Sequence, residues 1–121
     1  MPFHLSSALA VLERTPATFR ALLFGLPDAW LHATEGPDTF SPFENLGHLI
    51  HGERADWIPR ARIILAQGPD RRFEPYDRFA QYRESKGKSL ADLLDEFARL
   101  RSGNLATLRA WQLGERELAL E

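Results

Sequence analysis

Apolar residues recur every three or four positions along most of the chain, and the alternation typical of strands is nearly absent. The first stripe is interrupted at Thr15-Pro16, where proline removes one backbone hydrogen bond of a helix. We expect either a kinked helix there or a short helix followed by a second helix capped by Thr15. The segment Pro27-Asp28 and the polar residues 35–39 then form a connection. The stripe consists of Leu5, Leu9, Leu12, Phe19, Leu23 and Leu26.

The second helix has the clearest start. Ser41 is placed to be the N-cap, Pro42 the first helical residue, and Glu44 the carboxylate that completes a capping box. Pro59 frees the carbonyl of the residue four positions earlier, so it predicts a kink, and Gly68-Pro69 predicts the end. One face carries Phe43, Leu46, Ile50, Trp57, Ala61, Ile64 and Leu65, and we expect Trp57 to lie in the core.

The third helix begins with a second capping box, formed by Ser89 and Asp92, and is expected to stop near Gly114. Asn104 interrupts its apolar stripe and needs a polar partner. The stripe also carries Trp111, a second expected core residue, and residues 115–121 read as the start of a connection.

The segment before that helix, residues 68–88, is too aromatic for a simple spacer. A connection of this length inside a small domain is usually functional or contains a short helix. We expect a short helix near Tyr76–Tyr82. The segment as a whole is expected either to form a wall beside a binding pocket or to cover the open side of the bundle. Arg71 and Arg72 are candidates for binding an anionic cofactor, or are ordinary surface residues.

Length and composition agree with one all-α domain spanning residues 1–121. The chain has 121 residues, of which 44% are hydrophobic and 26% charged, as in ordinary globular proteins. Three amphipathic helices predict an up-and-down bundle. The net charge of −2 argues against nucleic-acid binding, and the lack of a long apolar run or leader-like start argues against membranes and secretion. We therefore expect a cytoplasmic protein.

Candidate chemistry is limited by residue type. The chain has no cysteine and only 4 histidines, so a metal would have to use His, Asp or Glu. Glu44, His48 and His51 are spaced four and three apart and share one face of the second helix. Neutral imidazole binds zinc, nickel, copper and iron, but such a pair on a helix shoulder is also commonly structural or solvated. His4 and His32 are expected in solvent.

Nearby charges favour ion pairs over acid–base chemistry. Glu53 is expected to pair with Arg60, or Arg54 with Asp56, within the second helix. No glycine-rich phosphate loop, Ser-His-Asp order or paired-carboxylate motif is present, which leaves phosphoryl transfer, triad hydrolysis and glycosidase chemistry without support.

The order and spacing of several motifs resemble those of the DinB-like superfamily, a family of four-helix bundles regarded as metalloenzymes. The resemblance extends over nearly the whole chain. It is carried by Thr15-Pro16, Gly25-Leu26-Pro27-Asp28, the run from Ser41 through Glu53 that contains Gly47-His48-Leu49-Ile50-His51, Asp56-Trp57, Arg60, and Phe73-Glu74-Pro75-Tyr76-Asp77-Arg78-Phe79-Ala80.

The resemblance implies a divalent metal, such as zinc or nickel, held by three histidines. One comes from the second helix and maps onto His48, with His51 and Glu44 as weaker candidates, and two come from a His-x-x-x-His pair on a fourth helix. Family members of known activity are thiol-dependent transferases and isomerases acting on small molecules. His51 and Asp77 are the further pocket candidates.

The sequence departs from the family pattern after Gly114, because no histidine follows His51. We expect a C-terminally truncated bundle, or a copy that has lost its activity. A missing helix would expose apolar stripes, which predicts a homodimer whose partner supplies the wall. Two hypotheses remain. In the first, the protein is a metal-dependent enzyme, of the thiol S-transferase type or a related transferase or hydrolase. In the second, it is a non-enzymatic bundle that serves self-association or partner binding.

Overall fold

The computed structural model describes all 121 residues as helices and connections, with no strand. The predicted all-α fold is thus confirmed. No helix combines the length and the apolar character that crossing a membrane would require. The long elements are α1 (Leu5–Leu23), α3 (Pro42–Ala55), α4 (Trp57–Ala66) and α6 (Leu90–Ala110), and the short ones are α2 (Asp28–Leu31), α5 (Ala80–Glu84) and α7 (Glu115–Leu118).

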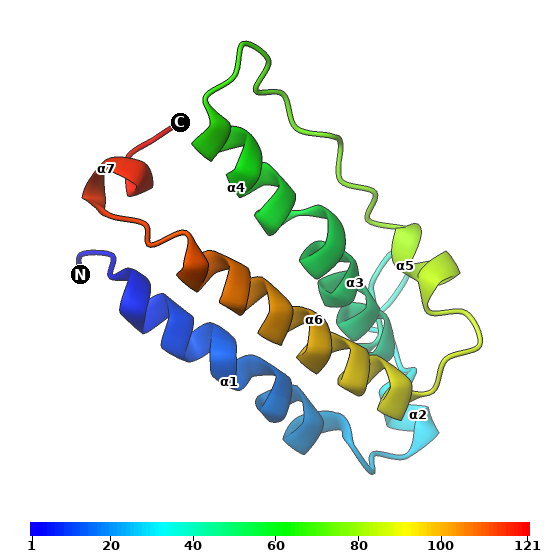
Figure 1. Cartoon of the computed structure of the whole chain (residues 1–121). Helices are drawn as coiled ribbons and strands as arrows, with labels where there is room; N and C mark the ends of the chain where they lie inside the picture. Colours follow the sequence, from blue (N-terminus) through cyan, green and yellow to red (C-terminus); the bar gives the residue numbers. More distant parts are fainter.

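The long helices are arranged around α6, which packs against α1 on one side and α3 on the other (Figure 1). α1 runs opposite to the other two, whereas α3–α4 and α6 run in the same direction. Residues 67–89 make this possible, because they return along the length of the bundle from the end of α4 to the start of α6 (Figure 1). The bundle is therefore up, down, down rather than strictly alternating.

Pro16 lies inside α1, which continues through it as one helix. The expected helix start at Thr15 is therefore wrong: its hydroxyl donates to the Val11 carbonyl at 2.9 Å instead of capping a new helix. Proline has no N–H to donate to the carbonyl four residues earlier, which belongs to Leu12. Nη1 of Arg101 donates to that carbonyl at 2.8 Å, so α6 satisfies the acceptor that proline leaves unpaired.

The predicted capping box at the start of α3 is confirmed. Ser41 Oγ accepts from the Glu44 N–H at 3.1 Å, and the Glu44 carboxylate accepts from the Ser41 N–H at 2.8 Å. The helix breaks at Asp56, whose φ of −105° and ψ of −91° separate α3 from α4. The break fits Pro59, which cannot donate to the carbonyl of Ala55. α4 ends just before Gln67, which takes the left-handed conformation at φ 49°.

The capping box that begins α6 is also confirmed, with the Asp92 N–H donating to Ser89 Oγ at 3.1 Å. The helix ends at Ala110, a few residues earlier than expected. The short helix in the aromatic segment begins at Ala80, later than the predicted position. Two short helices fall in segments predicted as connections, α2 after Pro27 and α7 after Gly114.

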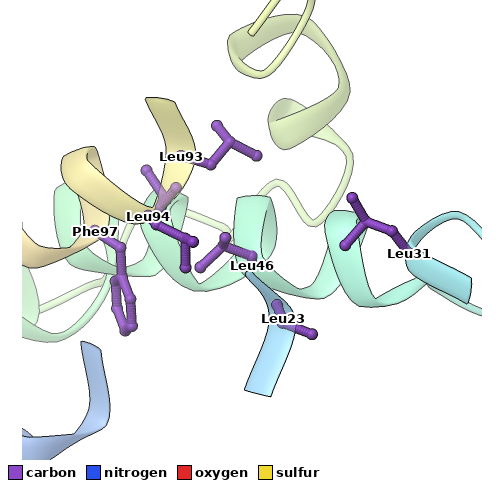
Figure 2. Close-up of a cluster of buried hydrophobic side chains, with 7 residues drawn as sticks. Leu23, Leu31, Leu46, Leu93, Leu94 and Phe97 are labelled. Atoms are coloured by element: carbon purple, nitrogen blue, oxygen red, sulfur yellow. The ribbon is translucent and has the colours of Figure 1, made fainter. Parts of the chain in front are cut away.

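The main core lies where the end of α1, α2, α3 and the first half of α6 meet (Figure 2). The ring of Phe97 is fully buried and meets the Phe19 ring edge to face, with centroids 5.7 Å apart. Trp57 and Trp111 are only half-buried and lie outside this cluster, which corrects the expectation that both are core residues. The cluster comprises Leu23, Leu31, Leu46, Ile50, Leu93, Leu94 and Phe97.

Candidate functional site

A polar cleft of about 370 Å³ lies beyond this core, where α3 passes into α4. Its walls come from both of these helices, from α6, and from the long segment that precedes α5. Leu49 and Trp57 are among its apolar lining residues. The charged and polar residues that line it are His48, Glu53, Asp56, Arg60, Tyr76 and Arg101.

His48 lies on α3 at the edge of this cleft and is half-buried. The hydroxyl of Tyr76 donates to the His48 carbonyl at 2.9 Å and lies 3.4 Å from the ring nitrogen Nδ1. The two rings meet edge to face with centroids 5.2 Å apart, and the Phe40 ring lies 5.5 Å away on another side. Tyr76 thus fixes the irregular segment onto α3 directly beside His48.

The surroundings of His48 favour its neutral form. Burial lowers the pKa of the imidazole below its usual value, and the positive charge of Arg78 lowers it further. Burial also raises the pKa of the Tyr76 phenol, so its hydroxyl stays protonated and available as a donor. At neutral pH the pair therefore offers an uncharged imidazole beside a phenolic hydroxyl.

His51 has a different role. Its Nδ1 lies 3.1 Å from each carboxylate oxygen of Glu84 on α5, and it does not line the cleft. Glu84 also lies 3.4 Å from Nη1 of Arg54, which in turn forms an ion pair with Glu96 of α6. His51 thus belongs to a network that ties α3 to α5 and α6.

Glu44 is also separated from His48, because its carboxylate is used in the capping box at Ser41. The three candidate ligands, Glu44, His48 and His51, consequently do not converge. No group of three or more His, Asp or Glu side chains is positioned to hold a metal ion. Since a zinc site needs at least three protein ligands, the residues of this chain do not by themselves fit the three-histidine site that the resemblance implies.

The inner wall of the cleft is a buried polar network that spacing along the sequence did not reveal. Glu53 is 3% exposed and accepts hydrogen bonds from Nε of Arg101 and Nε1 of Trp57. Asn104 donates to the Glu53 carbonyl at 2.7 Å, which provides the polar partner predicted for it. The expected pairing of Glu53 with Arg60 is therefore wrong, because its partner comes from a helix distant in sequence.

The other expected pairs are also redistributed. Asp56 binds Arg60, with Oδ1 and Nη1 2.8 Å apart, so it does not pair with Arg54. Asp77, a predicted pocket residue, instead binds Arg83 at 3.0 Å and does not line the cleft.

The two arginines considered for an anionic cofactor are used locally. Arg72 grips the carboxylate of Asp70, and Arg71 donates to the backbone carbonyls of Gly68 and Glu121. Within the aromatic segment, Tyr76 is the residue that reaches the cleft. The aromatic content of the segment indicated a functional role, but nothing in the sequence distinguished Tyr76 from the other aromatic residues around it.

Comparison with known families places the chain in a family. The description of the matching family is DinB superfamily, and the match covers residues 11–119. No curated protein matches the chain. The matched range includes α3, the cleft and all of α6, and the family agrees with the helical fold. The chain belongs to the DinB superfamily.

Proposed function

We propose that the cleft is the working site of a metal-dependent enzyme of the thiol S-transferase type, with His48 as the ligand that this chain contributes. The observation that carries the proposal is the position of His48. It is the one histidine that lines the cleft, and neither of its ring nitrogens is used in an ion pair. Its lowered pKa leaves a neutral imidazole, which is the form that binds a metal.

The proposal requires ligands besides His48. A divalent ion such as zinc or nickel would need at least two more, and a second protomer or a further segment would have to bring them to the cleft. Tyr76, Arg60 and Arg101 are the polar residues that a small-molecule substrate and a thiol cofactor would meet there. Tyr76 would orient them as a hydrogen-bond donor, since its phenol stays protonated.

Metal analysis of the purified protein tests this function. We expect nickel or zinc near one ion per chain, or one per two chains if protomers share it, and loss of that metal in His48→Ala. His4→Ala is the matched control, because His4 is exposed and lies outside the cleft. Metal-free protein, or equal metal content in His48→Ala and wild type, would overturn the proposal.

A second candidate is a non-enzymatic bundle that associates with itself. It is favoured by the arrangement of the helices, because α1 and α3 each pack chiefly against α6 and only 18 of 121 residues are buried. Large apolar side chains remain exposed on α1, among them Val11 at 67% and Leu22 at 66%. We infer a homodimer that covers this surface.

Sedimentation velocity at micromolar concentration tests the dimer. We expect Val11→Lys to shift the protein toward monomer without loss of helical circular dichroism. Ser6→Lys, at an exposed position on the same helix, is expected to leave the dimer intact. A wild-type protein that sediments as a monomer would rule out this candidate.

A further inference from the structure

We propose that the cleft beside His48 binds the carboxylate of a small monoanionic organic molecule, and that Arg60 is the residue that grips it. The inference rests on the proposed function in one respect, since both place the working site in this cleft. It requires no metal and no thiol, so either proposal can fail while the other stands.

The Arg60 guanidinium has an N–H group without a partner. Nη1 is held by Asp56, with an N–O distance of 2.8 Å. Nε is shielded from solvent and has no hydrogen-bond partner. The edge formed by Nε and Nη2 is therefore left without an acceptor, and a shielded N–H without one is unfavourable. Arg60 lines the cleft, so a ligand in the cleft can supply what the protein does not.

Arg72 shows what this edge binds when an acceptor is available. Its Nε and Nη2 donate to the two oxygens of Asp70, each at 2.9 Å. This side-on arrangement is the bidentate geometry in which guanidinium recognises a carboxylate. The same edge of Arg60 is free, which points to a carboxylate as the missing partner.

The neighbours of Arg60 leave room for such a ligand. The guanidinium carbon of Arg60 lies over the Phe73 ring, 5.1 Å from its centre. The Arg60 side chain is 33% exposed and Phe73 is 43% exposed, so both border solvent, and the proposed contact requires a side-chain shift that brings Nε to the ligand. Leu49 and Trp57 offer apolar contacts for the body of the molecule.

Charge in the cleft selects a monoanion. The two cations Arg60 and Arg101 are already balanced by Asp56 and Glu53. A phosphate ester with two charges would add repulsion from these carboxylates, whereas a carboxylate adds one charge to an unpaired guanidinium edge. Within about 370 Å³ the cleft fits a carboxylate with a compact apolar or aromatic body.

Titration of the metal-free chain in EDTA tests the inference, with phenylacetate as probe and its neutral analogue phenylacetamide as reference. We expect phenylacetate to bind about 10-fold more tightly than the amide, and more tightly than phenyl phosphate. The Nε–H resonance of Arg60 in nuclear magnetic resonance spectra is expected to move on addition of phenylacetate only. Equal affinity for the acid and the amide would overturn the inference, and tighter binding of phenyl phosphate would replace carboxylate by phosphate.

Matched variants separate Arg60 from general charge. Arg60→Gln is expected to weaken phenylacetate binding about 10-fold, whereas Arg62→Gln, an exposed arginine on the same helix, leaves it unchanged. Asp56→Asn removes the competing carboxylate and is expected to tighten binding. It keeps the inference testable if Arg60→Gln fails to fold. Unchanged affinity in folded Arg60→Gln, or in Asp56→Asn, would contradict the role of Arg60.

Discussion

The interface between α3 and α6 has two regions of opposite chemistry. Toward the start of both helices, Leu46 and Ile50 meet Leu94 and Phe97 in an apolar cluster. About one turn further along, the contact is made by a polar region that consists of Glu53, Trp57, Arg101 and Asn104. The two regions touch, because the Arg101 guanidinium lies 4.9 Å from the centre of the Phe97 ring.

The difference between the regions lies in what each specifies. Apolar burial is non-directional, so the cluster stabilises the bundle without requiring one particular pairing. The polar region requires defined partners. The Glu53 carboxylate must accept a hydrogen bond from Arg101, and Arg101 must also donate to the Leu12 carbonyl on α1. A sliding of α6 by one turn would leave these groups buried and unpaired. We infer that the polar region sets the register of α1, α3 and α6 and thereby the shape of the cleft.

The largest effect is expected from the apolar cluster. Phe97→Ala removes a fully buried ring and should lower the free energy of unfolding by about 4 kcal/mol. Urea unfolding followed by circular dichroism measures this loss. Leu26→Ala, at a partly exposed position outside the cluster, is the control and should cost far less. A loss below that of the control would mean that Phe97 is not in the core.

A single change in the polar region should cost nearly as much, for a different reason. Glu53→Gln leaves the Arg101 charge buried without its counter-ion, which we expect to lower the free energy of unfolding by about 3 kcal/mol. Replacing both residues, as in Glu53→Met with Arg101→Met, removes the charge along with its partner and should recover most of that loss.

The double variant sharpens the comparison of the two regions. Recovery of stability together with loss of phenylacetate binding would show that the pair specifies the cleft rather than stabilising the fold. Equal destabilisation of the double and single variants in urea unfolding would instead assign the polar region a stabilising role like that of the apolar cluster.

A smaller effect is expected at the start of α3, the helix that contributes residues to both regions. Ser41 is 2% exposed and pairs with the first-turn N–H of Glu44, so Ser41→Ala should cost about 1 kcal/mol. Ser41→Asp keeps an acceptor at the cap and is the matched control for the hydrogen bond. Thermal unfolding of the three proteins measures the difference, and an unchanged midpoint in Ser41→Ala would contradict the importance of this cap.

The sequence predicted the apolar region and its helix starts better than the polar region. Both capping boxes depend on residues three positions apart, so Ser41 and Ser89 could be assigned from local spacing alone. The positions of Leu46 and Ile50 followed from helical periodicity. The short helices α2 and α7 were not predicted, because one turn of helix has too few residues for a periodic signal.

The site was predicted less well because its contacts join distant parts of the chain. Candidates were paired within one helix, yet Glu53 finds Arg101 48 residues away and His48 finds Tyr76 28 residues away. Both contacts depend on the path of residues 67–89, which run back along the bundle and place α6 parallel to α3. No local sequence pattern predicts that path. Asn104 is the exception, since a polar residue on an apolar stripe signals a buried partner.

The smallest effect concerns pH and His48, at the outer edge of the polar region. Burial lowers its pKa in the folded state, so as pH falls the unfolded chain takes up this proton first. The stability that the neutral ring contributes is complete above the pKa of the unfolded chain, about 6.5, and is lost as pH falls from there through the folded pKa.

Urea unfolding at pH 7.5 and 5.5 should therefore show a smaller drop in the free energy of unfolding for His48→Gln than for wild type. His32→Gln, at an exposed position, should follow wild type. Identical drops in His48→Gln and wild type would mean that the ring is as free in the folded chain as in the unfolded one, and the wall that Tyr76 builds beside it would then not shield the cleft from water.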